Sequence, residues 1–213
     1  METIKYLAFV FMIIDHVGWL YFPDNMDFRI VGRLAVPLFC YFIAFGFSQT
    51  TNLNNYVLRL LKWGVVTQII LWSFNFEIYP QLNVLFTFAW SLIALALLQK
   101  NNQPKDQIII LGIFALLSEV FYFEYGFYAI LSVYLFSLFE NIPQYRWWLY
   151  WTLLNCIYFM FSPLSVFQLF AWFAPFLIPI KNQTKLKLPR LGWRWYPLYP
   201  AQHLLLLSIY FIF

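Results

Sequence analysis

Long, continuously apolar runs recur along the chain, and short polar segments separate them. A membrane-crossing helix needs about 20 mostly apolar residues, whereas the strands of a membrane barrel alternate polar and apolar positions over about ten residues. The runs lack that alternation, so they favour helices. We predict about nine spans, at Ile4–Phe22, Ile30–Ser48, Tyr56–Phe74, Leu82–Gln99, Gln107–Phe123, Tyr125–Phe139, Trp147–Phe161, Leu164–Ile180 and a last run that ends at Phe213.

The composition supports a membrane protein. Hydrophobic residues make up 63% of the 213 residues and charged residues only 10%. A soluble surface needs roughly 25–35% charged residues, which excludes a soluble enzyme, and disorder requires low hydrophobicity. We therefore expect an all-α, polytopic membrane helix bundle that forms one integral-membrane domain over residues 1–213.

The cations predict the orientation of the bundle. With nine spans the termini lie on opposite sides, and eleven Lys and Arg residues then share the side of the N-terminus while Arg29 and Arg33 lie on the other. Loops with excess Lys and Arg stay in the cytoplasm, so we expect a cytoplasmic N-terminus. The net charge of +4 reflects these loops and does not indicate nucleic-acid binding.

Five ionisable side chains interrupt the predicted spans. Such residues are costly in lipid and mark functional sites by default; here they are Asp15, His16, Arg33, Glu119 and His203. Depth along each span predicts an outward-opening pocket that collects Asp15, His16, Arg33, Asn83, Thr87 and Glu119.

Structural alternatives remain open for several of these residues. Asp15 and Arg33 could form a buried ion pair, Asn83 could cap a helix, and Glu119 could face lipid headgroups. Asp15 and His16 point about 100° apart on a helix, so Asp15 is not expected to orient His16.

Two prolines predict irregular helices. Pro37 cannot donate a hydrogen bond to the carbonyl of Arg33, which predicts a bend in the second span. If Pro200 starts the last helix, His203 lies in its first turn, near the positive end of the helix dipole. A kinked helix that packs His203 is the alternative.

Clustered cations indicate either anchoring to acidic lipid or a phosphate-rich cytosolic ligand. Arg59 and Lys62 open the third span, and a basic loop contains Lys187, Arg190 and Arg194. Two cysteines and two histidines are too few for an expected metal site.

Several of these segments together resemble the TraX family. The resemblance covers nearly the whole chain, and its motifs are Asp15-His16-Val17-Gly18, the segment from Arg29 to Phe39, Tyr56 to Leu60, Leu82 to Phe88, Tyr125 to Ala129 and Tyr196 to Leu204. That family is associated with acetylation of the pilin N-terminus. It is similar to wider transmembrane acyltransferases, which carry acetyl groups from cytosolic acetyl-CoA to acceptors beyond the membrane.

The resemblance implies a multi-pass acetyltransferase of the bacterial cytoplasmic (inner) membrane. Acetyl-CoA would be the donor, and a pilin N-terminal amine or a surface-glycan hydroxyl the acceptor. The implied catalytic group is His16, as general base or acetyl relay, and Arg33 corresponds to an arginine of the family.

The remaining candidates have supporting roles in this mechanism. Arg33, Asn83 and His203 would stabilise the thioester oxyanion, with Asp15 among the catalytic candidates. Arg59, Lys62, Lys187, Arg190 and Arg194 would hold the phosphates of the donor. A small-molecule transporter with a midplane polar site is the alternative function, and a scaffold subunit is a third.

Overall fold

The computed structural model describes residues 2–75, 80–101, 103–161, 163–182 and 188–212. Over these ranges the protein is helical, with one isolated bridge between Leu82 and Phe123. The helices are α1 (Glu2–Tyr21), α2 (Met26–Gly32), α3 (Ala35–Gln49), α4 (Leu53–Asn75), α5 (Val84–Lys100), α6 (Pro104–Val120), α7 (Gly126–Ser137), α8 (Gln144–Phe161), the 3-10 helices η1 (Pro163–Asn182) and η2 (Gly192–Arg194), and α9 (Trp195–Ile212).

The predicted all-α class is confirmed, because every predicted apolar run falls on a helix where the structure describes it. Three helical segments are long and apolar enough to cross a membrane: Glu2–Tyr21, Met26–Gln49 and Leu53–Phe74. Others are shorter, and α7 has only 12 residues, or about 18 Å at the rise of an α-helix.

The second apolar run is broken at Arg33, as the position of Pro37 predicts. Helix α2 ends at Gly32 and α3 begins at Ala35, with Arg33 and Leu34 in a turn between them. Pro37 is the third residue of α3, where its missing N–H leaves the carbonyl of Arg33 without a helical partner. The break places the Arg33 side chain at a helix junction.

The last helix does not start where the sequence suggested. Helix α9 runs from Trp195 to Ile212 with Pro200 inside it, so the prediction that His203 lies in the first turn is wrong. The first turn contains Pro197 instead, at a position where a helix needs no N–H donor. His203 is therefore in the middle of α9, and the argument from the helix dipole does not apply to it.

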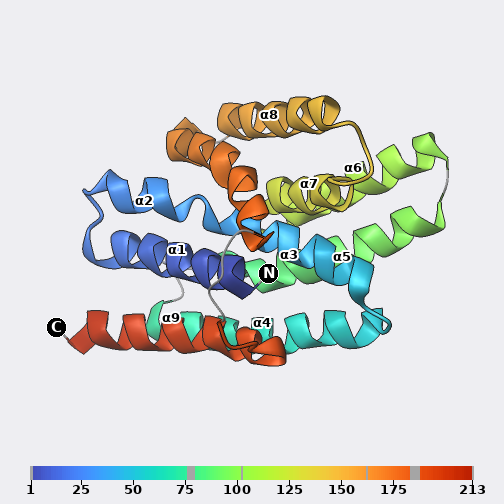
Figure 1. Ribbon diagram of the computed structural model, residues 1–213. Coiled ribbons are helices and arrows are strands. Elements are labelled where there is room, and N and C mark those ends of the chain that lie inside the picture. The colour runs from blue at the N-terminus through green and yellow to red at the C-terminus, as the bar shows by residue number, and fades with distance from the viewer. Residues whose placement is uncertain (1, 76–79, 102, 162, 183–187, 213) are drawn as a thin grey trace.

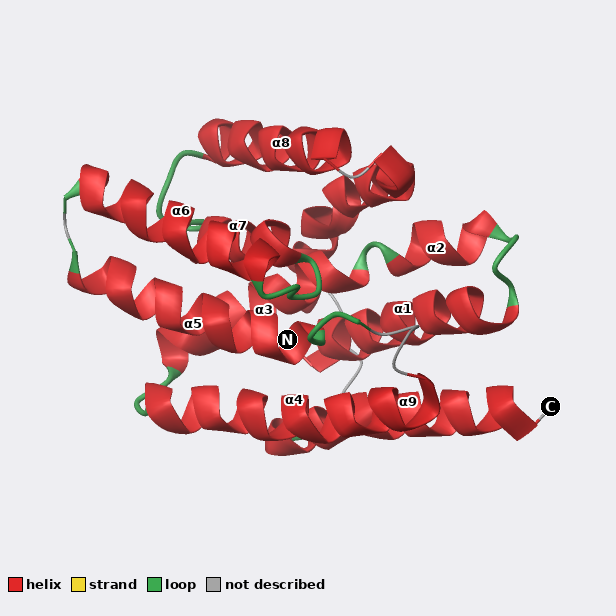
Figure 2. Ribbon diagram, turned by 180° about the vertical axis from the view of Figure 1, so that it is seen from behind, coloured by secondary structure: helices red, strands yellow, loops and turns green. Residues whose placement is uncertain are grey.

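The helices pack side by side with the first and last as neighbours (Figure 1). Helix α1 contacts α2, α3, α9 and η1, while α9 also lies along α4. Seen from behind, α9 and α4 still lie together at one edge of the molecule, and α8 lies at the opposite edge (Figure 2). This arrangement brings residues from both ends of the chain to the same place.

The segment just before α5 meets the connection between α6 and α7. The Leu82 N–H donates to the carbonyl of Tyr122 at 2.9 Å, and the Glu124 N–H donates to the carbonyl of Leu82 at 2.8 Å. Tyr125 has a left-handed backbone, and a Cβ at Gly126 would collide with the Glu119 carboxylate. This tight turn holds Glu124 and Tyr125 beside the start of α5.

Candidate functional site

The two histidines of the chain meet between α1 and α9. The ring centroids of His16 and His203 are 4.5 Å apart. Nδ1 of His16 lies 2.8 Å from Nε2 and 3.1 Å from Oε1 of Gln202, so this amide orients the His16 ring. The edge of the Tyr199 ring packs against His203, with 4.8 Å between their centroids. One stretch of α9 thus supplies His203 together with two neighbours of the histidine pair, Tyr199 and Gln202.

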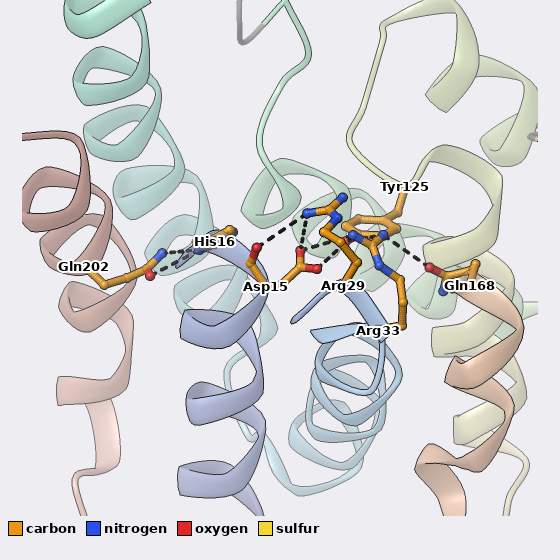
Figure 3. Close-up of polar contacts among 7 residues, drawn as sticks. All are labelled: Asp15, His16, Arg29, Arg33, Tyr125, Gln168 and Gln202. Atoms are coloured by element: carbon orange, nitrogen blue, oxygen red, sulfur yellow. Dashed lines mark hydrogen bonds and ion pairs between the residues drawn. The ribbon is translucent and has the colours of Figure 1, made fainter. Parts of the chain in front are cut away.

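Asp15 forms a separate network on the other side of α1, as Figure 3 shows. Its Oδ1 lies 2.9 Å from NH2 of Arg33, and its Oδ2 lies 3.2 Å from NH1 of Arg29. The ion-pair alternative for Asp15 and Arg33 is therefore confirmed, with Arg29 as an additional partner. The expectation that Asp15 does not orient His16 is also confirmed, because Gln202 makes that contact.

A polar cavity of about 320 Å³ lies between these two groups. Its lining combines the histidine pair, the Asp15 network, and residues of the segment before α5 and of the α6–α7 connection. The lining residues are Asp15, His16, Trp19, Arg29, Arg33, Leu71, Pro80, Gln81, Asn83, Glu124, Tyr125, Tyr158, Tyr199 and His203.

The structure thus brings Asp15, His16, Arg33 and Asn83 to one cavity, as predicted, and His203 joins them. Thr87 and Glu119 do not line the cavity. The Thr87 hydroxyl donates to the carbonyl of Glu124 at 2.8 Å, and the Glu119 carboxylate accepts the Phe127 N–H at 2.8 Å. Both side chains hold the turn before α7 in place.

Two cavity-lining atoms are buried without a hydrogen-bond partner in the described part of the chain: Nε of Arg33 and Nε2 of His203. Leaving such a donor or acceptor unpaired costs roughly 1–3 kcal/mol. His203 itself is only 5% exposed. Unpaired polar atoms beside a cavity are the groups that a ligand can satisfy.

Asn83 behaves as the helix cap that the sequence left as an alternative. Its Oδ1 accepts the Leu85 N–H at 3.2 Å, at the start of α5. Its Nδ2 donates to the carbonyl of Gly64 at 2.8 Å and to Oε1 of Gln68 at 2.9 Å. Because the two amide protons already have acceptors, Asn83 has none to donate to an oxyanion.

Glu124 lines the polar cavity but escaped the sequence analysis, since it lies in a turn and not within an apolar run. Its Oε2 accepts the Val84 N–H at 2.8 Å, at the N-terminus of α5. Burial raises the pKa of the Glu124 carboxyl to about 7, against the lowering effect of that hydrogen bond. The sequence analysis also missed Gln202, although it lies beside His203 in the Tyr-Pro-x-x-His segment.

A second cavity of about 400 Å³ has a mainly apolar wall and lies between α1, α3, α4, α5 and α9. We call it the aromatic cavity. Its lining includes Phe9, Phe39, Phe42, Phe88, Tyr56, Tyr196 and Tyr199, and its charged residues are Lys5 and Arg59. The Arg59 guanidinium stacks over Tyr56 at 5.9 Å and over Tyr196 at 5.7 Å.

A third, polar hollow of about 450 Å³ adjoins the aromatic cavity at Arg59. It lies at the α3–α4 loop, and its lining is Thr50, Thr51, Asn52, Asn55, Leu58, Arg59 and Lys62. The structure therefore brings two of the predicted phosphate-binding cations to one hollow. Arg190 and Arg194 are exposed and line none of these three cavities, and Lys187 lies outside the described residues.

Tyr199 lines both the aromatic and the polar cavity. Asn83 and Val84 mark the same boundary, since Asn83 lines the polar cavity and Val84 the aromatic one. A compound in the aromatic cavity and a compound in the polar cavity would thus approach each other beside Tyr199 and His203.

Comparisons with known proteins identify relatives. A family model described as "TraX protein" matches residues 1–210. The chain is 32% identical over 142 residues to a probable fimbrial assembly protein FimC, serogroup H1, of Dichelobacter nodosus, covering 60% of this chain and 57% of that protein. It is 29% identical over 89 residues to Protein TraX of Escherichia coli, covering 41% of this chain and 36% of that one.

A third relative is the uncharacterized protein RP591 of Rickettsia prowazekii, 35% identical over 68 residues, which cover 32% of this chain and 25% of that protein. The matched regions span at most 57% of the length of these relatives. No solved structure matches the chain.

Proposed function

The chain belongs to the TraX family, and on this premise we propose that it is a membrane-embedded acetyltransferase that moves an acetyl group from cytosolic acetyl-CoA to an acceptor beyond the membrane. The fimbrial assembly relative supports a pilin subunit as the acceptor, modified at its N-terminal amine. A surface-glycan hydroxyl is the second acceptor class that the same chemistry serves.

One observation carries this proposal: two cavities of different character meet at Tyr199, beside His16 and His203. A group transfer across a membrane needs a donor path from one side, an acceptor path from the other, and a base where they meet. The aromatic cavity suits a slender, mainly apolar arm such as pantetheine. The polar cavity suits an acceptor that carries hydrogen-bonding groups.

The donor would enter at the α3–α4 loop. Arg59 and Lys62 would contact its phosphates, since cationic side chains beside a helix N-terminus form a favourable anion site. The pantetheine arm would then run through the aromatic cavity toward Tyr199. Arg190, Arg194 and Lys187 would add attraction for the anionic donor at the cytoplasmic surface.

His16 would act as the general base. The acceptor nitrogen or oxygen attacks the thioester carbonyl, the new C–N or C–O bond forms, the acceptor proton passes to His16, and the C–S bond breaks. The proton then goes to the departing thiolate, which leaves as CoA. Nδ1–H of His16 would donate to Oε1 of Gln202, which keeps the ring oriented and leaves the lone pair of Nε2 to take the proton. Alternatively, His16 would first take the acetyl group from the thioester and would then pass it to the acceptor.

The structure changes the roles of the supporting residues. His203 is the best candidate to donate to the oxyanion, because its Nε2 is buried and unpaired within the described chain. Asn83 is not retained for that role, because its amide protons have other acceptors. Asp15 and Arg33 would act on the acceptor side, since Asp15 lies between His16 and Arg33 (Figure 3).

The proposed topology has about nine crossings with a cytoplasmic N-terminus in the bacterial inner membrane. The eleven-to-two division of cations supports it. The contact between Leu82 and the Tyr122–Glu124 turn also supports it, because both connections then lie on the outer side.

The direct test is acetyl transfer in sealed proteoliposomes. Radiolabelled acetyl-CoA is supplied on the side of the α3–α4 loop, and a synthetic peptide with a free N-terminal amine on the other side. We expect label in the peptide with the wild-type protein and none with empty vesicles or the His16→Ala variant. Folded protein that labels neither the peptide nor a surface glycan supplied in its place would exclude this function, and unmodified solute that accumulates across the membrane would favour the transporter.

A further inference from the structure

The polar cavity contains more positive than negative charge near Asp15. Two guanidinium groups, Arg29 and Arg33, share the single carboxylate of Asp15. The remaining contacts of Arg33 are to neutral oxygens, the Tyr125 hydroxyl at 3.5 Å and Oε1 of Gln168 at 3.4 Å. One positive charge of this cluster therefore lacks a counterion in contact with it.

Glu124, the other carboxylate of the cavity wall, does not supply that counterion. No ion pair joins Glu124 to either arginine among the described residues. Its Oε2 instead accepts the Val84 N–H at the positive end of α5. The His16 ring lies on the other side of Asp15 from the two arginines, where it contacts the neutral amide of Gln202.

The arginines also keep unused donors. An arginine carries five N–H donors, and Nε of Arg33 is buried with no partner in the described chain. Arg29 uses NH1 for Asp15, through both the carboxylate and the main-chain carbonyl at 3.5 Å. Both side chains line the cavity, so their remaining donors can reach a molecule inside it.

We propose that Arg29 and Arg33 form an anion-binding subsite for a carboxylate or phosphate group of the acceptor. Arginine suits this role because its planar fork matches carboxylate and phosphate oxygens. Asp15 holds the two guanidinium groups side by side. The bound anion would contact the same two groups together with the Asp15 carboxylate. The acceptor is accordingly an anionic molecule, and not merely an amine or a hydroxyl.

The location of the subsite explains how it would serve transfer, a role that rests on the proposed function. The Asp15 network and the two histidines line the same cavity, so an anion held by the arginines places the rest of the acceptor within reach of the histidine pair. Holding a reactant in place converts a bimolecular encounter into a nearly unimolecular step. Arg29 and Arg33 would thereby be positioning residues for the acceptor.

The anion could belong to a soluble acceptor or to a lipid headgroup, and binding measurements distinguish the two. Protein in neutral phosphatidylcholine nanodiscs is titrated with inorganic phosphate and with glucuronate, and binding is followed by calorimetry and melting temperature. The same measurements in discs that contain phosphatidylglycerol report competition by an anionic lipid. Acetyl-CoA is absent throughout, so failure of acetyl transfer does not affect the result.

We expect saturable anion binding by the wild-type protein, weakened about tenfold or more in Arg29→Gln, because a hydrogen bond to a charged group is worth about 1.5–3 kcal/mol. The matched control is Arg146→Gln, since Arg146 is exposed and outside the cavity; it should bind as the wild type does. Competition by phosphatidylglycerol would assign the subsite to a lipid headgroup, and its absence to a soluble acceptor.

Asp15→Asn separates a binding site from a purely structural ion pair. Removing the internal anion frees both guanidinium groups, so added anion should bind more tightly and raise the melting temperature of this variant more than that of the wild type. A structural role predicts a lowered melting temperature that anions do not restore. Three results would each overturn the proposal. They are no anion binding by the wild type, a loss of binding in Arg146→Gln equal to that in Arg29→Gln, and a melting temperature of Asp15→Asn that added anion does not raise.

Discussion

The imidazole rings of His16 and His203 lie 4.5 Å apart between centroids, one from the first helix and one from the last. Gln202 contacts Nδ1 of His16 from the same turn of α9 that carries His203. The pair therefore depends on the packing of α1 against α9. Substituting each histidine separately tests whether the two rings have different roles.

His16→Ala should lower the rate of acetyl transfer by about 10²–10⁴-fold, because it removes the proposed general base. His203→Ala should cost about 10²-fold, as expected for loss of an oxyanion donor. The double variant should be little worse than His16→Ala, since groups that act together are not additive. Turnover is measured beside the melting temperature in detergent. If His16→Ala stays active while His203→Ala does not, the base belongs to α9.

Reversing Arg59 and Lys62 to Glu together should weaken acetyl-CoA binding, because both line the hollow at the α3–α4 loop. Single exposed contacts are worth only about 0–1 kcal/mol, so the paired change is needed. The matched control reverses Lys105 and Arg146, two exposed cations away from the cavities. Affinity is measured by calorimetry at low salt. Equal affinities in the two double variants would place the donor elsewhere.

Tyr199→Ala should uncouple the donor from the acceptor, because Tyr199 lines both cavities at their boundary. Water from the polar cavity would reach the thioester, so hydrolysis of acetyl-CoA without acceptor should increase while transfer decreases. Tyr199→Phe keeps the ring and should retain low hydrolysis. Release of free CoA thiol measures the leak. A hydrolysis rate unchanged in Tyr199→Ala would show that this ring is not the partition.

Glu124 should make stability depend on pH. Its pKa is raised by burial to about 7 from an ordinary value of 4.5, so the folded protein binds this proton more readily than the unfolded chain. The resulting stabilisation is full below about pH 4.5 and is lost as the pH rises through about 7. Glu124→Gln should flatten the fall in melting temperature across that window. Glu119→Gln serves as the control, and parallel profiles for wild type and Glu124→Gln would contradict the prediction.

Accessibility of introduced cysteines should reveal the orientation. In a background with exposed Cys156 replaced by Ser, Gln103→Cys should react only from the cytoplasm and Asp24→Cys only from outside. The expectation follows from the eleven-to-two division of cations. Impermeant maleimide on intact cells and on inverted vesicles gives the two readings. Labelling of both positions from the same side would refute an odd number of crossings between them.

Local sequence determined the helical class and most of the helix boundaries. The backbone N–H and C=O groups of an apolar run need hydrogen-bond partners, and a helix supplies these partners from within the run. The break at Arg33 was predictable for the same reason, because Pro37 removes a donor one turn away. Ionisable residues within apolar segments likewise identify Asp15, His16, Arg33 and His203 as candidates from the sequence alone.

Tertiary packing decided which of these residues meet. The approach of α9 to α1 brings Gln202 and His203 to His16, and no spacing within one helix encodes that contact. The bridge between Leu82 and the turn before α7 places Glu124 at the start of α5, where a carboxylate finds an N–H donor. Helix α9 continues through Pro200 without the helical hydrogen bond to the carbonyl of Tyr196, so His203 lies in the middle of the helix. Such long-range choices follow from shape and charge complementarity between helices, which the pattern of a single helix does not contain.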